Sequence, residues 1–232
     1  MHSSALPRRR TRLTLAGVIA LTSMIIVLAT YGTRDSRAAI HRAHVHTAPA
    51  LSARAVAFRE AMRALWQTHG EYTERAIVDF VGGLPDTKLV VARLLHNQVD
   101  IGNAVKPYYG AKAGHELTAL LKAHINDAVA TLVAAQSGDA TVIAKAKGAF
   151  YANGNQIARF LHAANPRNWP LGAMRTMMRV HLNQVVGLVV DQLEGRYAAR
   201  IALYDVYIHH ILSGMADMLS MGIIDQFPAR FS

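Results

Sequence analysis

The stretch MRTMMRVHLNQVVGL, residues 174–188, decides the fold class of this chain. Its apolar side chains recur at Met174, Met178, Val185 and Leu188, a spacing that places them on one face of an α-helix. Helical spacing of this kind continues on both sides, from residue 51 to the end of the chain, and no run alternates apolar and polar residues as a strand would. The sequence therefore predicts an all-α protein.

Glycine and proline residues interrupt the helical pattern near Gly82, Pro107, Gly138, residues 165–170 and Gly195. We therefore expect helices over residues 52–82, 86–105, 111–136, 139–164, 171–193 and 196–222. Because the connections are short, consecutive helices are expected to pack as antiparallel neighbours. The predicted architecture is an up-and-down antiparallel bundle of about six long helices, which follows an N-terminal transmembrane or signal helix.

The first 50 residues predict that the bundle lies outside the cytosol. A basic segment, residues 1–12, precedes an uncharged apolar run, residues 13–31, which is close to the roughly 20 residues that a helix needs to cross a bilayer. Positive charge favours the cytosolic side of such a helix. Residues 32–50 are then a linker and residues 51–232 an extracytoplasmic helical bundle. We expect a single-pass protein of the cell membrane, with that membrane as its partner.

A cleavable signal peptide is the alternative interpretation of the same segment. Ser36 and Ala38 place small residues at the two positions that a signal peptidase inspects, before Ala39. The apolar run is longer than the core of most signal peptides, which favours the uncleaved anchor. With cleavage, the protein is expected to be secreted or periplasmic.

Composition argues against several classes of function. The net charge of +10 is typical of nucleic-acid-binding proteins, but residues 1–50 contain seven Arg and one acidic residue, so the leader holds most of the excess. The remainder has no basic stripe interleaved with aromatic residues, and no nucleic-acid partner is expected. A chain without cysteine has no disulfide, thiolate metal site or cysteine nucleophile. No hydrolase, kinase or transferase motif is present, so the sequence identifies neither a reaction nor a protein partner.

One polar residue stands near the middle of each expected helix. Successive members are separated by 27 to 29 residues, the length of one helix and one turn, in the series His69, Asn97, His124, Asn153, His181 and His210. In an antiparallel bundle, residues at equal distances from a turn lie at the same height. Each member also lies on the apolar stripe of its helix, so the set is expected to form one inward-facing layer.

The histidines of this layer predict a metal site. A single buried histidine is most simply explained as a hydrogen-bonded core residue, but four at matching positions each bring a donor and an acceptor that must be satisfied. Neutral imidazole is the commonest metal ligand in proteins, and nitrogen ligands favour copper or zinc. We therefore expect a divalent transition metal, copper or zinc, to bind through some of His69, His124, Asn153, His181 and His210.

Other interpretations of the layer remain open. Met174, Met177 and Met178 precede His181, and their thioethers would suit copper, although methionines at helical spacing usually fill a core. Hydrogen bonds between His and Asn side chains would also explain the layer as a means of fixing helix register in a structural or interaction domain of the envelope. An enzyme or haem protein that used the same pocket would need a cavity of the size of its ligand.

Three parts of the chain carry a resemblance to a known family: LLHNQVDIG at residues 94–102, ANP and NWP within 164–170, and the series HIL, MAD and QFP within 210–228. Over residues 65–231 the chain resembles a family of uncharacterised bacterial helical proteins, whose members are sometimes labelled glycosyltransferase or acetylglutamate kinase. The resemblance supports the helix boundaries, and nothing in this sequence supports either label. An Asp is common in that family where this chain has Asn155, which implies that a carboxylate ligand is missing here.

Overall fold

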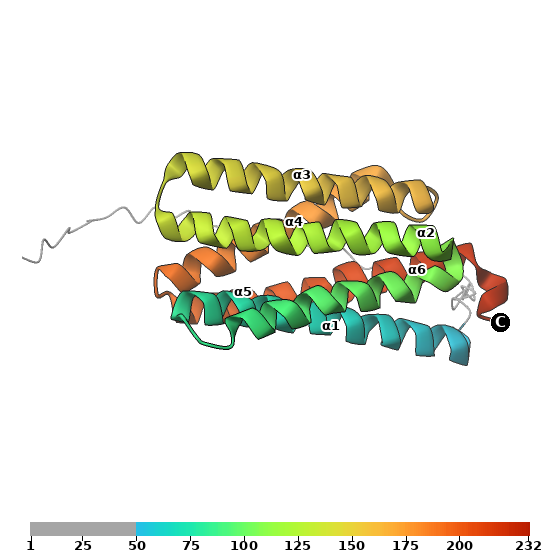
Figure 1. The fold of residues 1–232 in the computed structure, drawn as a ribbon. Helices are drawn as coiled ribbons and strands as arrows, with labels where there is room; N and C mark the ends of the chain where they lie inside the picture. Colours follow the sequence, from blue (N-terminus) through green and yellow to red (C-terminus); the bar gives the residue numbers. More distant parts are fainter. Residues whose placement is uncertain (1–49) are drawn as a thin grey trace, which may run out of the picture. The chain divides into compact units, whose positions relative to one another are not determined.

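The computed structural model describes residues 50–232, which pack as one compact unit. The predicted basic segment, apolar run and almost all of the linker lie outside these residues. The all-α prediction is confirmed for the described residues, which form helices and no strand. In chain order the elements are α1 (Ala53–Gly82), α2 (Thr87–Ser137), α3 (Ala140–Ala164), α4 (Leu171–Leu193), α5 (Tyr197–His209), the π-helix η1 (His210–Ala216), α6 (Asp217–Gln226) and the short 3₁₀ helix η2 (Pro228–Arg230) (Figure 1).

The element α2 reverses direction at Gly110, whose φ of 84° and ψ of 166° are not helical. The segments on either side pack closely. A Cβ atom added to Gly102 would lie 2.6 Å from the Gly114 carbonyl oxygen, and a Cβ atom added to Gly114 would lie 2.6 Å from the Gly102 carbonyl oxygen. The absence of a side chain at both glycines permits this approach of the two backbones. Residues 87–109 and 111–137 are therefore antiparallel neighbours, drawn in green and yellow-green in Figure 1.

Among residues 50–232, α2 is also the one helix that is long and apolar enough to span a membrane by its composition. Within its most apolar window, 39% of the residues lie buried inside the bundle. A core helix meets the same criterion of length and composition, so α2 gives no information on whether the protein lies in a membrane. The transmembrane segment predicted at residues 13–31 lies outside the described residues.

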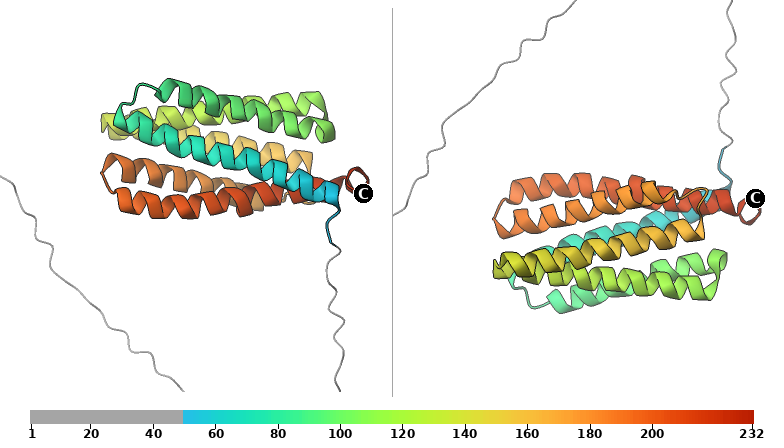
Figure 2. Two further views of the ribbon diagram at one scale, coloured as in Figure 1. Left: turned by 90° about the horizontal axis from the view of Figure 1, so that it is seen from below. Right: turned by 90° about the horizontal axis from the view of Figure 1, so that it is seen from above.

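Three helical hairpins build the bundle, and they turn at Gly83, Gly138 and Gly195, whose φ values are 65°, 71° and 69°. The first hairpin joins α1 to residues 87–109, the second joins residues 111–137 to α3, and the third joins α4 to α5 and α6. The three turns lie at one end of the bundle, and the chain ends at the other (Figures 1 and 2). The left-handed conformation of the turns favours glycine.

The last long helix, expected over residues 196–222, extends to Gln226 and changes its winding on the way. Between α5 and α6, residues 210–216 form a π-helix. Gly214 lies against the His210 ring in this segment, and a Cβ atom at that position would be 2.6 Å from the ring Nδ1. A π-helical turn inserted in an α-helix often marks a functional site.

Two sets of contacts hold the last helix against α1. Arg59 and Arg63 both donate hydrogen bonds to the Asp217 carboxylate, at distances of 2.8 to 3.1 Å. These bonds lower the pKa of Asp217 below its ordinary value. At the end of the bundle, the Ser52 hydroxyl donates to the carbonyl oxygen of Phe231, so the first and last turns of the described chain touch.

Candidate functional site

Three buried histidines, one from the first helix of each hairpin, meet in the middle of the bundle: His69 of α1, His124 of α2 and His181 of α4. Their exposed fractions are only 2%, 3% and 1%. His181 lies between the other two, and its ring centroid is 5.7 Å from that of His69 and 5.7 Å from that of His124. Each of the three precedes the glycine of its own hairpin turn by 14 residues, which is why they arrive at one height.

The same type of hydrogen bond joins the two helices of every hairpin at this height. A side chain of the second helix donates to the main-chain carbonyl that lies four residues before the central histidine of the first helix. The three bonds are Asn97 Nδ2 to Leu65 O (3.0 Å), Asn153 Nδ2 to Leu120 O (3.1 Å) and His210 Nε2 to Met177 O (3.3 Å). The bundle is therefore a threefold repeat of structure at its centre.

The second hairpin orients its histidine directly. Nδ1 of His124 lies 2.9 Å from Oδ1 of Asn153. Because the amide nitrogen of Asn153 already donates to Leu120 O, its oxygen faces the ring, and Nδ1 of His124 is the donor. Nε2 of His124 then has a free lone pair. Asn153, which the sequence predicted as a possible ligand, orients the ring and lines neither of the two central cavities described below.

The first hairpin holds its histidine through Gln98, a fully buried residue that sequence reasoning did not single out. Nε2 of Gln98 lies 3.3 Å from Nδ1 of His69. The same nitrogen lies 2.8 Å from Leu94 O and 3.2 Å from Asn97 Oδ1. An amide nitrogen has two hydrogens for these three acceptors, so His69, the most distant, is the most weakly held. The only signal in the sequence is that Gln98 adjoins Asn97.

The third hairpin leaves one nitrogen of its histidine without a partner. His210 stands where the other two hairpins have asparagine, and it is half-buried with its Nε2 bonded to Met177 O. Nδ1 of His181 is buried and has no hydrogen-bond partner within residues 50–232. The His181 ring also stacks on the Tyr207 ring, with ring centroids 5.6 Å apart. His210 therefore occupies the asparagine position of its hairpin and lies apart from the three central rings.

Burial keeps the three central imidazoles neutral at neutral pH. Loss of hydration lowers the pKa of His69 to about 3 and that of His124 to about 4. It also lowers the pKa of His181 well below its ordinary value of 6.5. For His69 and His181 the neighbouring imidazoles add to this shift, because a charge on one ring would repel a charge on another. The site thus presents three neutral rings, and the lone pair of His69 accepts from Gln98.

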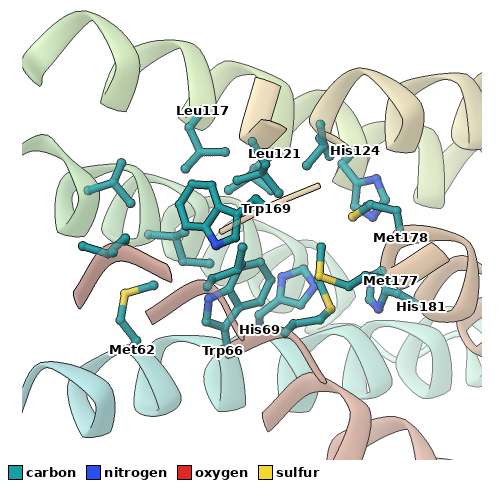
Figure 3. A pocket seen from close by; sticks show the side chains of 17 residues that line it. Met62, Trp66, His69, Leu117, Leu121, His124, Trp169, Met177, Met178 and His181 are labelled. Carbon is teal, nitrogen blue, oxygen red and sulfur yellow. The ribbon is translucent and has the colours of Figure 1, made fainter. Parts of the chain in front are cut away.

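Two small cavities adjoin the histidines, and all three rings line both of them. Figure 3 shows the first of the two. Their volumes are about 30 Å³ and about 40 Å³, and their other walls are almost entirely apolar. A single water needs roughly 10–15 Å³ on this scale, so each cavity holds a few atoms at most. Sites for organic ligands measure roughly 300–1,000 Å³, and a haem or an organic substrate therefore does not fit this core.

Within residues 50–232, no three His, Cys, Asp or Glu side chains converge as a ready-made metal site. Two imidazoles on one zinc ion, each with a Zn–N bond of about 2.0–2.1 Å, would have centroids about 5 Å apart. The observed separations of 5.7 Å are slightly larger. The structure thus shows three adjacent histidine rings that do not form a coordination geometry.

Comparison with known proteins assigns no function to this layer. No protein-family model, curated protein or solved structure matches the chain.

Proposed function

We propose that the protein binds a single transition-metal ion, copper or zinc, between His69, His124 and His181. The observation that carries this proposal is the meeting of three buried, neutral imidazoles at separations of 5.7 Å around His181. The hydrogen bonds to His69 and His124 within the described residues reach Nδ1. Nε2 of His124 therefore carries the lone pair of its ring, whereas His69 accepts from Gln98 at Nδ1 and offers Nε2 to an ion only in its other tautomer.

An ion that bound Nδ1 of His181 would also remove an energetic penalty from the core. A buried polar atom without a hydrogen-bond partner costs about 1–3 kcal/mol, and Nδ1 of His181 is such an atom. Coordination uses the lone pairs of neutral imidazoles, and for Nε2 of His69 this requires the ring proton to move to Nδ1, the atom that faces Gln98. The bond from Nδ1 of His124 to Asn153 is of the kind that orients metal-binding histidines elsewhere.

Metal analysis of the full chain, purified without a His tag, tests the proposal. Plasma mass spectrometry is expected to find about one copper or zinc per chain at neutral pH, lost when His124→Ala and His181→Ala are combined. The matched control is His96→Ala, which removes an imidazole from the surface, where 67% of the side chain is exposed. Absence of metal from the wild-type chain, or equal metal in the double variant, would overturn the proposal.

A structural role for the layer is the second candidate, and the three hydrogen bonds between the hairpin helices favour it. In that case the polar side chains fix helix register in an envelope domain, as buried polar residues do in some other bundles. The two candidates differ in their response to chelators. A metal-binding bundle loses thermal stability when the ion is removed, whereas a purely structural layer is unaffected.

We further propose that an anchor at residues 13–31 holds the domain outside the cytosol, and that its helices form an up-and-down bundle of six rods. The basic residues before this apolar run support the orientation. The reversal at Gly110 supports counting α2 as two rods. A reporter that is active only outside the cytosol, fused after Ser232, is expected to be active, and the mass of the mature chain would show whether cleavage after Ala38 occurs.

A further inference from the structure

We propose that the ion is monovalent copper, Cu(I), held by the central histidines together with a thioether sulfur of Met177 or Met178. This inference rests on the metal site proposed above and specifies its chemistry. It depends on two features that the histidines alone do not provide, the absence of acidic groups from the site and the presence of sulfur.

The charge of the site favours a monovalent ion. No Asp or Glu lines either central cavity. The cost of moving an ion from water into an apolar interior grows with the square of its charge. A divalent ion would keep two uncompensated charges in this core, whereas Cu(I) would keep one. Zinc sites in proteins commonly offset this cost with thiolate or carboxylate ligands, which are absent here.

Sulfur is the second feature. Four methionines line the first of the two cavities: Met62, Met177, Met178 and Met215. Met177 and Met178 precede the central histidine of α4 by four and three residues, and their exposed fractions are 4% and 3%. Figure 3 shows both side chains beside the histidine rings. Soft thioether ligands select Cu(I) over harder divalent ions, so this lining distinguishes between the two metals of the proposed function.

One of these methionines also borders a pocket at the surface. Met178 lines a surface pocket of about 120 Å³ between α3 and α4, and it also lines the inner cavity with the histidines. Gly154 packs beside it, since a Cβ atom there would lie 3.7 Å from the Met178 methyl carbon and 2.6 Å from Leu182 Cδ1. Arg175 and Arg179 line the outer pocket, and their charge opposes a divalent cation twice as strongly as a monovalent one. Met178 thus separates solvent from the histidines.

Anaerobic titration of the full chain with Cu(I), against a chromogenic Cu(I) chelator, tests the inference alongside a separate titration with Zn(II). We expect one equivalent of Cu(I) to bind, with zinc weaker by at least about 100-fold, and we expect sulfur in the first shell of the copper X-ray absorption spectrum. Combining Met177→Leu with Met178→Leu is expected to weaken Cu(I) binding by about tenfold or more and to remove the sulfur signal.

Met174→Leu is the matched control, because Met174 is fully buried on the same helix but lines neither central cavity. Leucine replaces methionine with little change of volume, and circular dichroism verifies that each variant folds. One equivalent of zinc with weaker Cu(I) would overturn the Cu(I) inference and leave the metal site standing. Cu(I) binding that is unchanged in the double variant would overturn the role of the thioethers. Failure of both metals to bind would overturn the metal site itself.

Discussion

The second and third hairpins differ at one position, and the difference determines which central histidine is free. The Asn153 side chain has both an amide nitrogen, which donates to Leu120 O, and an oxygen, which accepts from His124. His210 reaches the equivalent carbonyl through Nε2, but no acceptor or donor of His210 reaches His181. An amide can serve two partners at one height, whereas an imidazole in this position serves one. The repeat is thus complete in the second hairpin and interrupted in the third.

The third hairpin also differs from the other two in the type of helix at this position. In the third hairpin, residues 210–216 form a π-helix, and the His210 ring packs on Gly214. The first and second hairpins contain regular α-helix at Asn97 and Asn153. The imidazole of His210, in place of the shorter amide of Asn97 or Asn153, therefore coincides with a local change from α-helix to π-helix.

Acidification of the metal-free chain is expected to have the largest effect, because it acts on all three hairpins. Each central histidine titrates near 6.5 in the unfolded chain, but in the folded chain the pKa is about 3 for His69 and about 4 for His124. Between these values the unfolded state binds more protons than the folded state. The contribution to stability is therefore fully present above pH 6.5 and is lost as the pH falls towards 4, with a slope of up to about 4 kcal/mol per pH unit for three such groups.

Urea denaturation at several pH values between 7.5 and 4.5, followed by circular dichroism, measures this slope. His181→Leu removes one of the three groups and should reduce the slope by about a third. A free energy of unfolding that stays constant from pH 7 to pH 5 would contradict the burial of neutral imidazoles.

Asn153→Leu breaks the complete hairpin and is expected to lower the free energy of unfolding by about 1–3 kcal/mol, because it leaves Nδ1 of His124 buried without an acceptor. Asn126→Leu is the matched control, since Asn126 is exposed in the same hairpin and surface changes usually stay within about 0.5 kcal/mol. Denaturant midpoints measure both effects. Equal midpoints for the two variants would show that the bond to His124 contributes nothing.

His210→Asn completes the third hairpin and is expected to have the smallest effect, a gain of about 1 kcal/mol. The amide would donate to Met177 O and present its oxygen to Nδ1 of His181, as Asn153 does for His124. Nitrogen NMR of the imidazole would detect the new bond at His181. His209→Asn is the control on the exposed neighbouring position, and a loss of stability specific to His210→Asn would show that the imidazole is needed where it stands.

Local sequence signals were sufficient to predict most of the fold. The apolar period and the glycines at Gly82, Gly138 and Gly195 predicted the helices and, for these three, the places where they end. The expected end at residue 105 was too early, because helical structure continues through Pro107 to the reversal at Gly110. Proline usually interrupts a helix, but here it lies within one turn of the point where the chain reverses.

The candidate site could be predicted only in part. Equal spacing from the turns predicted that His69, His124 and His181 lie together, because that relation depends on helix length alone. The role of Gln98 and the separate position of His210 depend on side-chain reach and on the π-helix, neither of which has a signal in the sequence. The small volume of the cavities likewise depends on how neighbouring helices fill the space.

The contact between the two ends of the described bundle has a consequence for its connectivity. The Ser52 hydroxyl bonds to Phe231 O, and the Phe58 and Phe231 rings lie 5.2 Å apart. A short linker could therefore join the ends without strain, and the chain could be opened at the exposed turn beside Gly138. Such a circular permutant is expected to keep every helix and the histidine layer in place, because the cut and the new link both lie outside the helices.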